Sequence, residues 1–231
     1  MNLIPSGRAA GGPTRDDAGV SLVELLISMI LVSVLGTMIV TTFIQGANAA
    51  YDSDARTADT QQAKILTENT SRMLRLAVDP DGTGALTPFE VATPDEVVFY
   101  AADGNRSGAP SADTPPSKVR IYRDGDVLKM NVKTAVVVGA TTSWPGTGNT
   151  RTIGTGVANG SLPMFTYLAA GDIGVDADGV AVTSLDNVDG TLASGALGDV
   201  EAVEIWVKVA TKSTTRSIGT TAVTRVTLLN Q

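Results

Sequence analysis

An uninterrupted apolar segment dominates the start of the chain. Residues 25–51 carry no charged side chain, and residues 25–44 consist mainly of Leu, Ile, Val and Met. As a helix, these 20 residues span roughly 30 Å, which is the thickness of the hydrocarbon core of a bilayer. The pattern therefore predicts one membrane-spanning helix.

A weaker helical pattern follows over residues 45–78, which contain no proline. Side chains that would share one helix face recur every three or four residues: Tyr51, Ala55, Ala58, Gln62, Ile65, Asn69, Met73 and Leu76. We expect this stripe to pack on a sheet. Joined to the apolar segment, it gives one helix over residues 20–78, roughly 88 Å long, which Pro80 ends.

Beyond residue 90 the pattern changes to short strands separated by Gly, Pro, Asp and Ser. The expected strands are 96–101, 118–123, 126–133, 164–169, 200–210 and 221–229. Residues 139–160 and 171–199 are rich in Gly, Thr, Asp and Asn and are expected to be loops. The predicted fold class is α+β, with a long N-terminal helix packed on an antiparallel β-sheet domain with long loops (residues 79–231).

A hairpin is predicted around Asp124-Gly125, a common two-residue turn. This turn would place Ile121 opposite Leu128 and Val119 opposite Met130 on one apolar face.

Basic side chains occupy the other face of this hairpin: Lys118, Arg120, Lys129 and Lys133. The same register places Arg120 opposite Lys129, so an acidic group is needed nearby. Either Glu201 or Glu204 balances these charges on a solvated face, or the face contacts an anionic partner such as a neighbouring subunit or DNA.

Composition excludes several classes of chemistry. The chain has 231 residues, a net charge of −7, and neither cysteine nor histidine. Disulfides, thiolate nucleophiles, Ser-His relays and the common zinc sites are therefore excluded. The acidic balance also argues against general nucleic-acid binding.

Three hypotheses account for the apolar segment. A secretory signal could be cut after Ala47-Asn48-Ala49, but the apolar region of such signals is only about 7 to 15 residues long. A plain membrane anchor fits the length, and Arg8 and Arg15 favour a cytoplasmic N-terminus. That hypothesis does not explain Glu24, because a carboxylate in lipid needs a positive partner or a proton.

The third hypothesis explains Glu24. The run Gly19-Val20-Ser21-Leu22-Val23-Glu24-Leu25-Leu26-Ile27-Ser28-Met29 closely resembles the prepilin cleavage and methylation motif of type IV pilins and pseudopilins. The sequence departs from the family pattern in having Val20 where Phe is usual, and Asp16 and Asp17 in the leader.

The resemblance implies a 1–19 leader that prepilin peptidase removes by cutting between Gly19 and Val20, with methylation of the new Val20 amine. It implies that residues 20–44 form the transmembrane and filament-core helix and residues 45–78 its amphipathic continuation. Glu24 would act in assembly by pairing with the charged N-terminus of a neighbouring subunit.

Partners implied by the family are other pilin or pseudopilin subunits, the inner-membrane assembly machinery and membrane lipid. The implied location is the cytoplasmic membrane, spanned once with the N-terminus inside, and then an extracytoplasmic filament at the cell surface. The succession from residues 74–77 through Pro80 and Phe89 to residues 97–100 is most similar to J-type minor pseudopilins.

One loop has the spacing of a 12-residue calcium loop. Its ligands would be Asp79, Asp81, Thr83, the Ala85 carbonyl and Glu90. The other interpretation is a solvated acidic turn. A second acidic loop, with Asp172, Asp176 and Asp178, has poorer spacing.

The sequence thus predicts a structural subunit and not an enzyme: a minor pilin or pseudopilin of a pilus-like or type II secretion-like filament. The alternative is a signal-anchored extracytoplasmic binding domain or a carboxylate-dependent hydrolytic domain. A cut before Val20 is required only if the chain is such a filament subunit.

Overall fold

The computed structural model describes residues 21–81, 86–102, 115–139, 141–169, 191–210 and 219–228. The chain divides into two compact units, Met1–Ala50 and Tyr51–Gln231; the second is called the sheet unit below. Helix α1, Leu22–Leu74, contributes residues to both. It ends four residues before the predicted limit of residue 78 and well before Pro80.

The sheet unit contains three antiparallel sheets within its described residues. The largest has the order β1-β2-β3-β4-β7, formed by Phe89–Ala92, Glu96–Ala101, Ser117–Asp124, Val127–Lys133 and Asn149–Thr155. The second has the order β10-β9-β8, formed by Thr220–Thr227, Val200–Val209 and Phe165–Ala169. A small hairpin joins β5 (Val136–Val138) to β6 (Thr141–Ser143), and the 3-10 helix η2 covers Ser194–Asp199. The predicted α+β class, a long N-terminal helix with antiparallel sheets, is confirmed.

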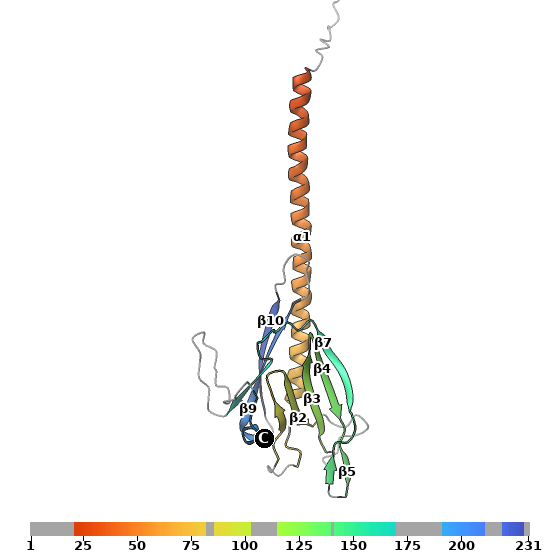
Figure 1. The fold of residues 1–231 in the computed structure, drawn as a ribbon, viewed down its shortest axis with the longest axis vertical. Coiled ribbons are helices and arrows are strands. Elements are labelled where there is room, and N and C mark those ends of the chain that lie inside the picture. The colour runs from red at the N-terminus through yellow and green to blue at the C-terminus, as the bar shows by residue number, and fades with distance from the viewer. Residues whose placement is uncertain are drawn as a thin grey trace, which may run out of the picture. The chain divides into compact units, whose positions relative to one another are not determined.

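The core of the sheet unit lies between the two larger sheets and the Tyr51–Leu74 part of α1. Figure 1 shows β4 and β7 on one side of this part of the helix and β10 on the other. The Phe89 ring packs against Phe99 at 6.1 Å and edge-on against Tyr167 at 6.4 Å, which joins the two sheets. The buried Tyr167 hydroxyl donates to the Thr93 carbonyl at 2.9 Å, so its polar end is satisfied.

Strands with clear alternation were predicted well. Strand β2 has the predicted bounds, and the inward face of β9, with Val203, Ile205, Val207 and Val209, is buried as expected. The prediction of a loop over residues 139–160 was wrong, because β6 and β7 lie within it. Strand β7 has few apolar residues and forms because it pairs along β4 from Asn149 to Thr155.

The predicted hairpin register was also wrong. The turn residues are Gly125 and Asp126, so Ile121 pairs with Met130, and Val119 pairs with Val132. Gly125 has φ 65°. The usual two-residue hairpin turns require a positive φ at their first central residue. Each partner shifts by two residues, and therefore the apolar face is preserved although its pairs differ.

The predicted packing face of the helix was only partly right: Met73 and Leu76 pack against the core, but the fully buried positions are others. Ile65 is 49% exposed, whereas the buried positions are Asp59, Ala63, Leu66, Thr67, Thr70, Ser71 and Leu74. The reason is close packing: an added Cβ on Gly154 of β7 would lie 2.5 Å from Leu66 Cδ2. Small side chains let the helix approach the strand, and their hydroxyls are satisfied by helix carbonyls, as in Thr67 to Ala63 (2.7 Å) and Ser71 to Thr67 (2.6 Å).

Candidate assembly site

The apolar part of α1 is exposed along its whole length. Between residues 22 and 44, every large hydrophobic side chain that the structure describes is 50 to 78% exposed. An exposed apolar surface of this extent is stable only when lipid or another protein surface covers it. Helix α1 is the one helix in the described part of the chain that is long and apolar enough to cross a membrane.

Hydroxyl groups within this segment are compatible with lipid because the helix itself satisfies them. The hydroxyls of Ser28, Ser33, Thr37, Thr41 and Thr42 each donate to a backbone carbonyl four residues earlier, at 2.7 to 2.9 Å. In hydrocarbon, an unsatisfied donor would cost several kcal/mol, about as much as any buried polar group without a partner. These residues therefore do not disturb an otherwise apolar helix surface.

Glu24 is the one ionisable side chain between residues 22 and 44. It lies in the first turn of α1, where the unpaired amides at the helix start favour a negative charge. Its backbone carbonyl accepts a hydrogen bond from Ser28, but its exposed carboxylate has no partner within the described residues. In lipid this carboxylate needs a proton or a partner from elsewhere, and the predicted partner, the Val20 amine, lies with Gly19 outside the described residues.

The basic face of the hairpin is neutralised by residues other than those predicted. Arg120 donates to both oxygens of Glu96, at 2.7 and 2.9 Å, and these hydrogen bonds raise the pKa of its guanidinium. Lys118 pairs with Glu90, and Lys129 with Asp124 at 2.5 Å.

The predicted partner Glu204 instead pairs with Arg225 at 3.1 Å. Arg120 lies opposite Asn131, and not opposite Lys129 as predicted. Three of the four basic residues of this face are thus held in ion pairs, whereas Lys133, opposite Lys118, has none within the described residues. The face is therefore not the cluster of free positive charge that phosphate binding would require.

Part of the predicted calcium loop is described. The Asp81 amide donates to Asp79 Oδ1 at 3.1 Å, whereas Thr83 and Ala85 lie outside the described residues. Glu90 is on β1, where its carboxylate pairs with Lys118 and accepts a hydrogen bond from the Tyr100 hydroxyl at 3.0 Å. Within the described residues no group of three or more acidic side chains could hold a metal ion. Calcium binding stays a prediction, and Asp172, Asp176 and Asp178 lie outside the described residues.

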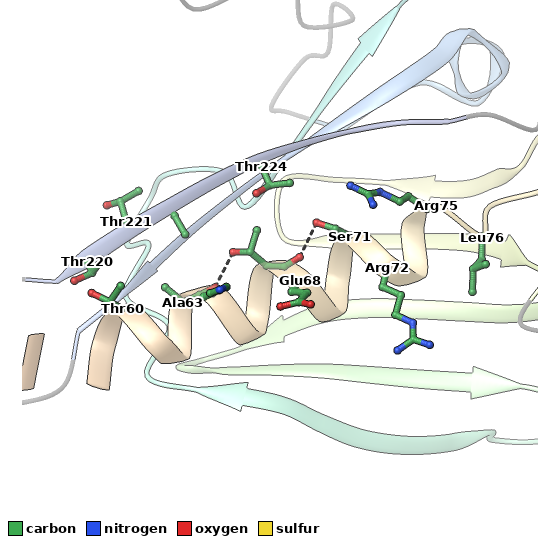
Figure 2. Close-up of a pocket in the computed structure, with 13 residues that line it drawn as sticks. Thr60, Ala63, Glu68, Ser71, Arg72, Arg75, Leu76, Thr220, Thr221 and Thr224 are labelled. Atoms are coloured by element: carbon green, nitrogen blue, oxygen red, sulfur yellow. Dashed lines mark hydrogen bonds between the residues drawn. The ribbon is translucent and has the colours of Figure 1, made fainter. Parts of the chain in front are cut away.

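Sequence reasoning missed a groove in the sheet unit. It lies between α1 and β10, has a volume of about 820 Å³, and is lined mainly by Thr, Ser and charged side chains (Figure 2). We call it the α1–β10 groove. Residues more than 140 positions apart form its walls, for example Thr60 and Thr220, so no local pattern could have revealed it.

Comparison with known proteins supports the assignment of the N-terminal segment. Residues 14–40 match the prokaryotic N-terminal methylation motif. The match includes Gly19, Val20 and Glu24, and it supports a type IV pilin-like chain that prepilin peptidase processes. No curated protein matches the chain. The motif covers 27 of the 231 residues (14 to 40 inclusive), so it describes the start of α1 and not the sheets.

Proposed function

We propose that this chain is a minor pilin or pseudopilin, a structural subunit of a type IV pilus-like or type II secretion-like filament. After prepilin peptidase cuts between Gly19 and Val20, the subunit would stay in the cytoplasmic membrane and then enter the filament through its N-terminal helix. The observation that carries the proposal is the exposed apolar segment of α1, with Glu24 in its first turn, within and beyond the methylation motif matched over residues 14–40.

Glu24 has a clear role in this proposal. A lone carboxylate among lipid tails is costly, and a cationic amine close by removes much of that cost. The Val20 amine of an adjacent subunit would be such a cation. Their attraction would be stronger in this low-dielectric setting than at a surface, which favours assembly over the dispersed subunit.

Filament incorporation of Glu24 variants tests the proposal. Removing the carboxylate deletes the attraction but makes the helix more apolar, so Glu24→Ala should insert normally, be processed and accumulate in the membrane. We expect it to be depleted from sheared filaments at least tenfold, the effect of about 1.4 kcal/mol per subunit. Glu24→Gln matches the shape without the charge and should behave like Glu24→Ala.

Thermal melting of the detergent-extracted variants provides the control for folding. Glu24 belongs to the unit Met1–Ala50, so the sheet unit should melt unchanged in both variants. Normal incorporation of Glu24→Ala would contradict the pairing role, and equal incorporation of Glu24→Lys would remove the electrostatic argument.

The alternative of a carboxylate-dependent hydrolase gains no support from the groove. Hydrolysis of this kind uses two carboxylates that face one cleft. Among the described residues that line the α1–β10 groove, Glu68 is the one carboxylate.

A further inference from the structure

The α1–β10 groove has residues of strand β10 as one wall and a helix face as the other. Its strand wall consists of Thr220, Thr221, Ala222 and Thr224, and its helix wall extends from Thr60 to Leu76. Figure 2 shows β10 running along the helix, with Thr220, Thr224 and Arg75 at the space between the two. Both walls belong to the sheet unit, and a volume of about 820 Å³ is within the usual range for clefts that hold a ligand.

Strand β10 has one unpaired edge within the described residues. It pairs with β9 alone, in a register that places Ala222 opposite Val207. The Trp206 amide donates to the Met164 carbonyl, on the side of β9 that faces β8. Successive residues of a strand direct their backbone groups to opposite sides, so the odd-numbered residues of β9 bond to β10. Their partners on β10 are even-numbered, and therefore the amides and carbonyls of Thr221 and Val223 face the open edge.

The helix wall carries unpaired charge that is mostly positive. Lys64, Glu68, Arg72 and Arg75 follow one another at spacings of four, four and three residues, which places them on one side of α1. None of these side chains has an ion pair or hydrogen bond within the described residues, although five ion pairs form elsewhere. The wall therefore presents a net charge of +2 in a chain whose net charge is −7.

Other polar groups of the helix wall are already used. The hydroxyls of Thr67 and Ser71 donate to carbonyls of the helix itself. What a ligand finds here is thus the open edge of β10, with Thr221 in the groove and Val223 beside it, and three cations along α1.

We propose that the groove receives an extended acidic polypeptide segment that adds to β10 as a further strand. Strand addition would satisfy the open edge of β10, and carboxylates on alternate residues would face Lys64, Arg72 and Arg75. The spacing agrees: Lys64 and Arg72 are about 12 Å apart along the helix axis, and residues i and i+4 of a strand are about 13 Å apart. This inference goes beyond the proposed filament function and does not depend on it.

Peptide binding to the full-length chain in detergent tests the proposal. The probe is a fluorescent eight-residue peptide, (Asp-Val)4, and fluorescence anisotropy measures its binding at low salt. We expect (Asp-Val)4 to bind and (Lys-Val)4 not to bind. An added strand bonds to its neighbour through the amides of alternate residues. We therefore compare one peptide with every Asp amide methylated and one with every Val amide methylated, and expect one of the two to lose binding.

Variants of both walls identify the binding site. Arg72→Gln combined with Arg75→Gln should weaken binding about twofold to thirtyfold, as expected for the loss of two exposed ion pairs. Arg56→Gln, a cation on the same helix outside the groove, is the matched control and should change nothing. Val223→Pro should remove an edge amide without removing a bond to β9, and should weaken binding while the melting temperature stays close to that of the parent.

Several results would overturn the proposal. Equal binding of (Lys-Val)4, or equal binding of both methylated peptides, would exclude an acidic added strand. Unchanged affinity in the double arginine variant would place the peptide elsewhere. If (Asp-Val)4 does not bind but the chain self-associates and Val223→Pro abolishes that association, the occupant is a second copy of the chain and not an acidic peptide.

Discussion

At the scale of single residues, the environment of an ionisable group determines what that group contributes. Tyr100 is partly buried, and its hydroxyl donates to Glu90, which also pairs with Lys118. Burial and then the neighbouring Glu90 carboxylate raise the pKa of Tyr100 to about 12. The neutral phenol is thus favoured in the folded protein, and ionisation near this carboxylate opposes folding.

The raised pKa of Tyr100 predicts a loss of stability at alkaline pH. Between pH 10 and about 12 the folded state keeps a proton that the unfolded state has lost, so the free energy of unfolding falls as pH rises through this range. Below pH 10 the contribution is fully present. In Tyr100→Phe the fall should be smaller, as measured by thermal melts across this pH range. Tyr122→Phe, on the same sheet, is the control, and equal slopes in all three proteins would contradict the prediction.

The calcium hypothesis concerns two carboxylates that precede β1 and one on β1 itself. If Asp79, Asp81 and Glu90 bind calcium, millimolar calcium should raise the melting temperature of the full chain, because it would bind the folded state alone. Asp81→Ala should remove this shift. Since Lys118 now pairs with Glu90, Lys118→Gln should enlarge it. An unchanged melting temperature of the parent, or a shift that survives Asp81→Ala, would exclude this loop as the site.

At the scale of elements, some strands and the buried helix face depend on packing against a neighbouring element, and the local sequence pattern does not predict them. Strands β2 and β9 were predictable because alternating apolar residues are the signal of a half-buried strand. Strand β7 was not, because the pattern over Asn149–Thr155 is polar and its partner β4 supplies most of its stability. The buried helix face was missed for a related reason: it combines the apolar Leu66 and Leu74 with the small polar Thr67, Thr70 and Ser71, so hydrophobicity alone does not mark it.

Gly154 tests how closely α1 packs on β7. An added Cβ would lie 2.5 Å from both Leu66 Cδ2 and Gln62 Nε2, and Leu66 is fully buried. Gly154→Ala should therefore destabilise the sheet unit by about 1–3 kcal/mol, which corresponds to a melting temperature lower by about 2–4 °C per kcal/mol.

Gly195→Ala is the matched control, because no atom would lie within 4 Å of its added Cβ. Its stability should stay within about 0.5 kcal/mol of the parent. A Gly154→Ala variant as stable as this control would show that helix and strand can separate at no cost.

At the scale of the whole molecule, the two units differ in how much sequence reveals about them. The Met1–Ala50 unit has its chemistry in contiguous residues, so the motif around Gly19, Val20 and Glu24 could be recognised directly. The α1–β10 groove could not, because its walls come from distant segments and its charge is the reverse of the chain's overall charge. Local sequence therefore predicted the candidate assembly site, and tertiary structure was needed for the groove.

The mature N-terminus shows most directly whether the chain is processed as a pilin-like subunit. The chain should be expressed with a prepilin peptidase, extracted from membranes, and analysed by intact mass and by sequencing of its first peptide. We expect loss of 19 residues (1 to 19 inclusive) and a chain that begins with N-methylated Val20. A Gly19→Leu variant should keep its leader. A parent chain that retains Met1, or that begins after Ala49, would exclude cleavage between Gly19 and Val20.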